Sequence, residues 1–101
     1  MNNAAIVEAF ALEGMQAEDY GNTVVIYFGH EEVRLSEFGN SIQIHVRNSC
    51  GKHPLIIEGN EGVIKTLAPK KNAEDMAWIE LGQLVTITRG KKKISFVPTA
   101  G

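Results

Sequence analysis

The 101-residue sequence has one cysteine, three prolines and 7% aromatic residues, and its apolar runs are short. One cysteine, Cys50, leaves no second thiol in the chain for an internal disulfide, which fits a reducing compartment. No segment approaches the ~20 apolar residues that a bilayer-spanning helix needs. Residues 1–3 carry no basic side chain and Glu8 interrupts the apolar residues that follow, so we expect no signal peptide. These absences predict a cytoplasmic protein without a membrane partner.

Several catalytic and cofactor motifs are also missing. The chain has no Gly-x-x-x-x-Gly-Lys-Ser/Thr or Gly-x-Gly-x-x-Gly segment, and it has no Gly-x-Ser-x-Gly segment. The sequence signatures of nucleotide hydrolysis, dinucleotide redox chemistry and one large hydrolase class are therefore absent. We predict a protein that is not an enzyme and that needs no cofactor.

The composition itself is that of one ordinary globular domain. Of the residues, 44% are hydrophobic and 22% are charged. A chain of this length buries about two-thirds of its unfolded surface, which is enough for one core and too little for two. We therefore expect a single domain over residues 1–101.

The small net charge of −2 hides an asymmetry between the two halves of the chain. Residues 1–50 contain two arginines and seven acidic residues, whereas residues 51–101 contain eight basic and five acidic residues. Such an asymmetry hints at an acidic partner or at head-to-tail self-association.

The apolar pattern predicts one N-terminal helix followed by a β-rich body. Ile6, Val7 and Phe10 share one helical stripe, and Asn3 is the predicted N-cap of a helix over about residues 3–17. Gly14 is a candidate for an earlier end of that helix. From about residue 23 to residue 97 the pattern alternates instead. The predicted strands are 23–28, 33–38, 41–47, 54–58, 63–67, 84–88 and 93–97.

Residues 76–81 fit either a short helix or a strand, and the β-prone pair Trp78-Ile79 favours the strand. Seven or eight short strands at this spacing predict a mainly β fold, an antiparallel β-sandwich or a small barrel.

A basic turn is the most suggestive local feature. Arg89, Lys91, Lys92 and Lys93 surround Gly90 at the predicted tip of the last hairpin, and Lys70 and Lys71 could extend the patch. Such a patch can contact nucleic acid or another polyanion in a salt-dependent manner. Lysines at a hairpin end also serve simply to prevent edge-to-edge association, and the chain is acidic overall.

Three further groups are candidates for contact or chemistry. Gln43, His45 and Arg47 share the polar face of one strand and form a possible recognition row. Leu12, Met15 and Trp78, the last within Met76-Ala77-Trp78, form a possible apolar interface. Cys50 and His53 form a Cys-x-x-His pair, which supplies only half of the four ligands of a zinc site.

These features predict a small non-enzymatic protein-interaction module, such as an inhibitor, an adaptor, or an accessory or structural protein of a phage or mobile element. The expected partner is another protein, and self-association stays open. The alternative is nucleic-acid or polyanion contact through residues 89–93. A further alternative is an enzyme or metal site built on Cys50 and a histidine.

Overall fold

The computed structural model describes residues 1–29, 31–47, 52–68, 70 and 74–100. This part of the chain forms one helix and nine strands. Their bounds are α1 Asn3–Leu12, β1 Gln16–Asp19, β2 Thr23–Phe28, β3 Glu31–Phe38, β4 Ser41–Arg47, β5 Leu55–Gly59, β6 Gly62–Leu67, β7 Glu74–Glu80, β8 Val85–Arg89 and β9 Lys92–Phe96.

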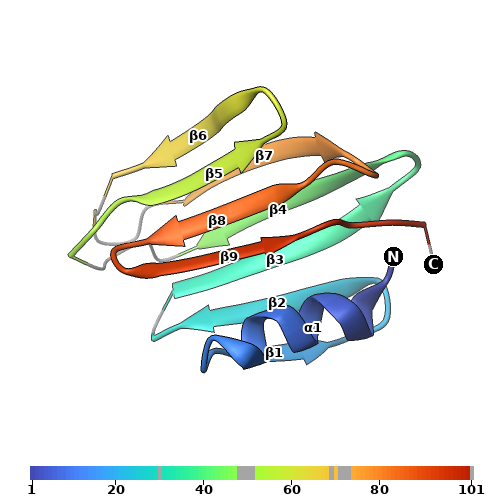
Figure 1. Ribbon diagram of the computed structural model, residues 1–101, viewed down its shortest axis with the longest axis horizontal. Coiled ribbons are helices and arrows are strands. Elements are labelled where there is room, and N and C mark those ends of the chain that lie inside the picture. Colours follow the sequence, from blue (N-terminus) through green and yellow to red (C-terminus); the bar gives the residue numbers. More distant parts are fainter. Residues whose placement is uncertain (30, 48–51, 69, 71–73, 101) are drawn as a thin grey trace.

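The strands form two antiparallel sheets that lie face to face (Figure 1). Sheet A has the order β1-β2-β3-β4-β7, and sheet B has the order β6-β5-β8-β9. Helix α1 contacts β1, β2 and β9, so it continues the layer of sheet B beyond β9 and covers the end of sheet A. The sheets are not closed into a barrel, so of the two folds that the strand spacing predicted the chain forms the antiparallel sandwich. No helix in the described part of the chain is long and apolar enough to cross a membrane.

One hydrophobic core fills the space between the two sheets. The alternation of β4 shows how the sequence builds it, because Ile42, Ile44 and Val46 are buried while the residues between them face outward. Helix α1 adds Ile6 and Phe10, both fully buried. The Cα radius of gyration is 12.3 Å, close to the value of about 13 Å expected for a single domain of this size.

The helix is shorter than the predicted span of residues 3–17. It ends at Leu12, and Gly14 follows with a φ of +73°, a conformation that glycine adopts without strain. The next residues form β1, which pairs with β2 from Gln16 opposite Tyr27 onward. The N-cap is Asn2 rather than the predicted Asn3, and its side chain makes no capping hydrogen bond. Asn3 is the first helical residue, and its side-chain amide donates to Asp19 Oδ1 and to the Gly21 carbonyl.

Residues 76–80 of the ambiguous segment 76–81 belong to the strand β7, which pairs with β4. Ala77 and Ile79 face the core, whereas Met76 and Trp78 are exposed on the outer face of sheet A. The other predicted strands agree with the structure to within two residues at each end. The nine strands exceed the predicted seven or eight because β1 is not among the predicted strands, its first two residues lying within the predicted helix.

The charge asymmetry of the sequence becomes an asymmetry between layers. The strands of sheet A carry eight acidic and two basic residues. The strands of sheet B carry one acidic and four basic residues. This separation arises because the first four strands lie in sheet A and the acidic strand β7 joins them there.

Candidate functional site

The candidate site lies where β6 and β7 end the two sheets, and we call this the open side of the sandwich. β6 is the outermost strand on that side (Figure 1), and it contacts β7 only sparsely. Two apolar side chains of β6 are therefore left in solvent, since Val63 is 61% exposed and Ile64 is 41% exposed. Exposed apolar residues on an edge strand indicate a surface that another chain could cover.

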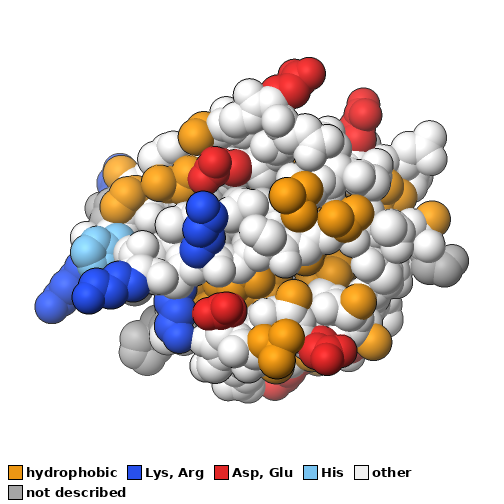
Figure 2. Space-filling view, viewed as in Figure 1, with side chains coloured by type: hydrophobic (Ala, Val, Ile, Leu, Met, Phe, Trp, Pro, Cys, Tyr) orange, Lys and Arg blue, Asp and Glu red, His pale blue; other side chains and the backbone are white. Residues whose placement is uncertain are grey.

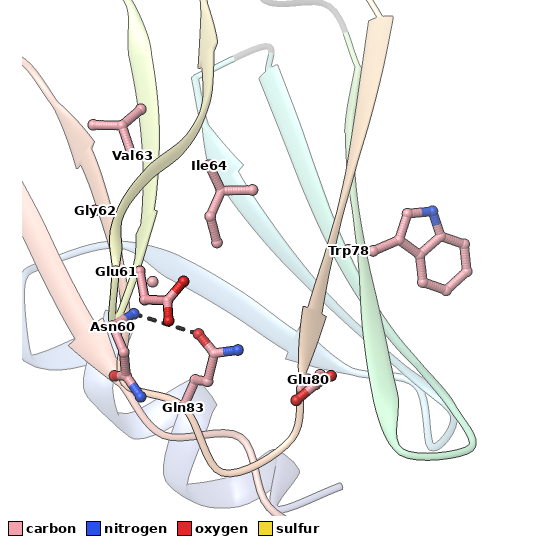
Figure 3. Close-up of a pocket in the computed structure, with 9 residues that line it drawn as sticks. Asn60, Glu61, Gly62, Val63, Ile64, Trp78, Glu80 and Gln83 are labelled. Atoms are coloured by element: carbon pink, nitrogen blue, oxygen red, sulfur yellow. Dashed lines mark hydrogen bonds between the residues drawn. The ribbon is translucent and has the colours of Figure 1, made fainter.

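A groove of about 770 Å³ opens between the β5–β6 turn, β7 and the loop that follows β7. Figure 3 shows Ile64 pointing into the space between β6 and β7, while the Trp78 indole points away on the other side of β7. Two hydrogen bonds tie the walls together: the Asn60 N–H donates to Gln83 Oε1 at 3.3 Å, and the Leu84 N–H donates to Asn60 Oδ1 at 3.1 Å.

Gly59 lets these walls approach each other. A Cβ added there would lie 2.8 Å from Ile64 Cδ1 and 2.8 Å from Gln83 Oε1, both closer than real Cβ contacts. A larger residue at this position would displace the flexible ends of the Ile64 and Gln83 side chains and so change the shape of the groove.

The groove is anionic. Glu61 and Glu80 are the charged residues among its nine lining residues, and both are exposed. At its other end the gap between β6 and β7 is bridged by Lys65, whose Nζ lies 3.3 Å from Asp75 Oδ2. The Met76 N–H, and to a smaller extent Lys65, lowers the pKa of Asp75.

An apolar strip of Phe38, Met76 and Trp78 adjoins the groove on the outer face of sheet A. The rings of Phe38 and Trp78 are tilted against each other with centroids 5.6 Å apart. All three side chains are about half exposed, at 54%, 48% and 53%. The groove and the strip therefore flank the same strand, β7.

The predicted recognition row does face outward, beside this strip. Gln43 lies opposite Trp78 in the register of β4 with β7. His45 Nε2 lies 2.5 Å from Glu74 Oε1, so this imidazole already has a partner within the protein. Arg47 is exposed and lies opposite Glu74. The row therefore adds polar groups at the border of the open side.

The predicted basic patch is smaller than the sequence suggested. Arg89 faces inward, 11% exposed, and its Nη1 lies 2.5 Å from Oε1 of Glu31, which is 1% exposed. Arg89, which the sequence analysis placed in the basic patch, is thus not exposed with the lysines, because its strand position faces the opposite sheet. Lys92 Nζ donates to the Glu13 carbonyl at 2.6 Å. Lys91, Lys93 and Lys70 are exposed, and Lys71 lies outside the described residues.

Of the Cys50–His53 pair, the structure describes only His53. Cys50 lies outside the described residues. His53 is exposed and its ring lies against Gly90, where an added Cβ would be 2.8 Å from Cδ2. Within the described ranges no group of three or more His, Cys, Asp or Glu side chains is arranged to hold a metal ion.

The predicted apolar interface is not one surface. Leu12 is 79% exposed near the end of α1, whereas Met15 packs partly against the core. Trp78 belongs to β7, at the opposite edge of sheet A from β1. Of this group only Trp78 lies on the open side.

Phe38, Val63, Ile64 and Glu80 belong to this site although no sequence motif singled them out. For the two β6 residues one signal was present: by spacing Lys65 shares a strand face with Val63 and Leu67, and a charge on an otherwise apolar strand face is typical of an edge strand. Comparison of the chain with protein-family models, with curated proteins and with solved structures gave no match. The geometry of the open side therefore carries the functional proposal alone.

Proposed function

We propose that this protein is a non-enzymatic protein-interaction module that binds another protein through the open side of the sandwich. The observation that carries the proposal is the apolar strip of Phe38, Met76 and Trp78 next to the groove. Apolar side chains that remain in solvent together and are rimmed by polar groups are typical of interaction sites, and tryptophan is enriched among residues that dominate binding energy. An inhibitor, an adaptor or a phage accessory protein would each use such a surface, and a cytoplasmic partner fits the single cysteine.

The test is affinity capture with three forms of the protein. The wild type is compared with Met76→Gln/Trp78→Gln, which removes apolar contact area from the open side, and with Leu12→Gln, which changes a still more exposed apolar residue on α1. We expect the double variant to capture its partner about tenfold less well, the effect of about 1.4 kcal/mol of lost binding energy. Capture that is equal in all three forms, or that is absent with the wild type, would contradict the proposal.

A second candidate is contact with a polyanion at the end of the molecule where β8 turns into β9. Figure 2 shows basic side chains gathered at that end beside a histidine. The packing of His53 on Gly90 brings Lys52 and Lys91 to the same end. Retardation of single-stranded and duplex DNA across a salt series, with Lys91→Ala/Lys93→Ala as the variant, tests this candidate. Unchanged affinity in that variant would exclude it.

A further inference from the structure

The four edge strands of the two sheets differ in how they are protected against another chain. β1 has only four residues and is covered by α1, and β9 lies beside the same helix. β6 has a register irregularity opposite Ile57 and Glu58 and carries the inward-facing Lys65. Short length, a covering helix, bulges and inward charges are the usual means by which sheets avoid edge pairing.

β7 has only one of these features, the inward-facing Asp75, whose carboxylate is paired with Lys65 of β6. It pairs with β4 over all seven of its residues in an uninterrupted register, and no described strand pairs with its other edge. It contains neither proline nor lysine, and it exposes Met76 and Trp78. The backbone groups on that edge are therefore available to a further strand of sheet A.

The surroundings of β7 suit a strand at that edge. β6 extends beyond β7 in the other layer (Figure 1), so a strand added to β7 would lie beneath β6. Its inward side chains would meet Ile64, which points into that space (Figure 3), and its outward side chains would lie beside Trp78. Both faces of the added strand would thus find apolar neighbours.

A second copy of the same strand fits poorly. In the antiparallel register that pairs all seven residues of β7 with themselves, Glu74 lies opposite Glu80 at both ends. Like charges directly opposite each other destabilise a strand pair. With Asp75 and the groove residue Glu61, these carboxylates outnumber His45 and Lys65, the basic side chains that contact Glu74 and Asp75, so the edge favours basic side chains in the partner.

We propose that β7 is a docking edge for an extended, basic segment of another protein, which joins sheet A as an antiparallel strand. The proposal rests on the interaction function above and names the site and the chemistry of the partner. Main-chain hydrogen bonds to β7 supply affinity, and Lys or Arg side chains opposite Glu74, Asp75 and Glu80 supply selectivity.

The probe is the synthetic peptide Lys-Val-Thr-Val-Thr-Lys-Lys, with blocked ends. Its lysines fall opposite the three acidic residues of β7, its valines face the underside of β6, and its threonines lie on the outer face. In an NMR titration with the full chain we expect saturable shifts of the amides of β7 and β6. The acidic analogue Glu-Val-Thr-Val-Thr-Glu-Glu is expected to bind at least about tenfold less tightly, because three ion pairs become like-charge contacts.

Two N-methylated peptides separate strand addition from simple filling of the groove. Methyl groups on the odd-numbered or on the even-numbered backbone nitrogens remove alternate N–H donors, and only one of the two sets faces β7. We expect one methylated peptide to lose binding and the other to retain most of it. Similar binding of both would overturn the proposal.

A charge-reversal variant tests the partner's chemistry. Glu80→Lys is expected to bind the basic peptide about threefold less tightly and the acidic peptide more tightly. The control Glu8→Lys makes the same charge change on the exposed face of α1 and is expected to leave both affinities unchanged. Equal effects of the two variants would indicate a general charge effect and would overturn the proposed site.

Failure of this proposal is distinguishable from failure of the interaction function. If capture depends on Met76 and Trp78 but the basic peptide neither binds nor competes with the captured partner, the proposed interaction function is supported and strand addition at β7 is wrong. If the mass measured by light scattering doubles on concentration and Glu80→Lys abolishes the increase, the occupant is a second copy and the basic-partner proposal is wrong. Loss of both capture and peptide binding overturns both proposals.

Discussion

The α1 side of the sandwich and the β6/β7 side end in opposite ways. On the α1 side, Phe10 packs against Phe96 with ring centroids 5.5 Å apart. Asn2 also hydrogen-bonds to Val97 and Thr99 beyond the end of β9. On the other side the two edge strands meet through one ion pair and leave apolar side chains in solvent. The contrast indicates that α1 completes the core, whereas the β6/β7 side leaves apolar side chains exposed.

The largest expected effect on stability comes from removing one aromatic ring on each side of the sandwich. Phe10→Ala is expected to lower the free energy of unfolding by about 4 kcal/mol, because a fully buried ring leaves a cavity. Trp78→Ala is expected to cost less than about 1 kcal/mol, since its side chain is 53% exposed. Urea denaturation measures both values. A comparable loss in the two variants would show that β7 is as essential to the core as α1.

The buried pair of Arg89 and Glu31 links the two sheets between these sides. Arg89→Met is expected to lower the free energy of unfolding by about 3 kcal/mol, because it leaves the Glu31 carboxylate buried without its cation. Replacing both residues, as Glu31→Leu/Arg89→Met, is expected to recover most of that loss. Denaturant curves of the single and double variants provide the check, and a double variant no more stable than the single one would contradict this account.

The sequence correctly predicted the strands that bury one face and expose the other, because their side chains alternate between apolar and polar. The alternation of residues 41–47 defined β4 correctly because every second side chain meets the core. The segment Gln16–Asp19 has little β-propensity, and it becomes a strand only because β2 offers it a partner. The tertiary pairing thus overrode the local helical signal that extended the helix to residue 17.

The candidate site was less predictable for a different reason. Exposure of Val63 and Trp78 follows from the order of strands within the two sheets, and strand order is a long-range property. The inward direction of Arg89 likewise depends on which residue of the opposite sheet it meets. A basic run around a glycine identifies a turn, but it does not show which of its cations lies before the turn and faces the core.

The inward charge of β6 offers a smaller test of the open side. Lys65→Val is expected to change the free energy of unfolding by less than about 1 kcal/mol, since the ion pair with Asp75 is more than a third exposed. It is expected to increase self-association, because it removes a charge that keeps this edge apart from others. Light scattering across a concentration series detects the change, with the loop variant Lys70→Val as control. Equal masses for both variants would show that the charge of Lys65 does not protect β6 from self-association.

The smallest expected effect compares one carboxylate on each side by pH titration. Asp19 Oδ1 accepts hydrogen bonds from the Gly21 N–H and from Asn3, each at 2.8 Å. These bonds, the backbone one first, hold the pKa of Asp19 below its ordinary value of 3.8. The pKa of Asp75 is also lowered from 3.8, chiefly by the Met76 N–H. Both ionised groups thus favour the folded state above about pH 3.8, and the benefit is lost as the pH falls through each folded-state pKa.

The side-chain partners of these two carboxylates contribute less than the backbone does. Carbon-13 NMR titration of the carboxyl groups is expected to give both midpoints below 3.8 in the wild type. Asn3→Ala and Lys65→Met are each expected to raise the midpoint of their own aspartate only part of the way back, because the backbone N–H remains. If Lys65→Met returned Asp75 fully to 3.8, the ion pair would be the main interaction of that carboxylate. The ion pair would then hold β6 and β7 together, and a strand that pairs with β7 beneath β6 would first have to break it.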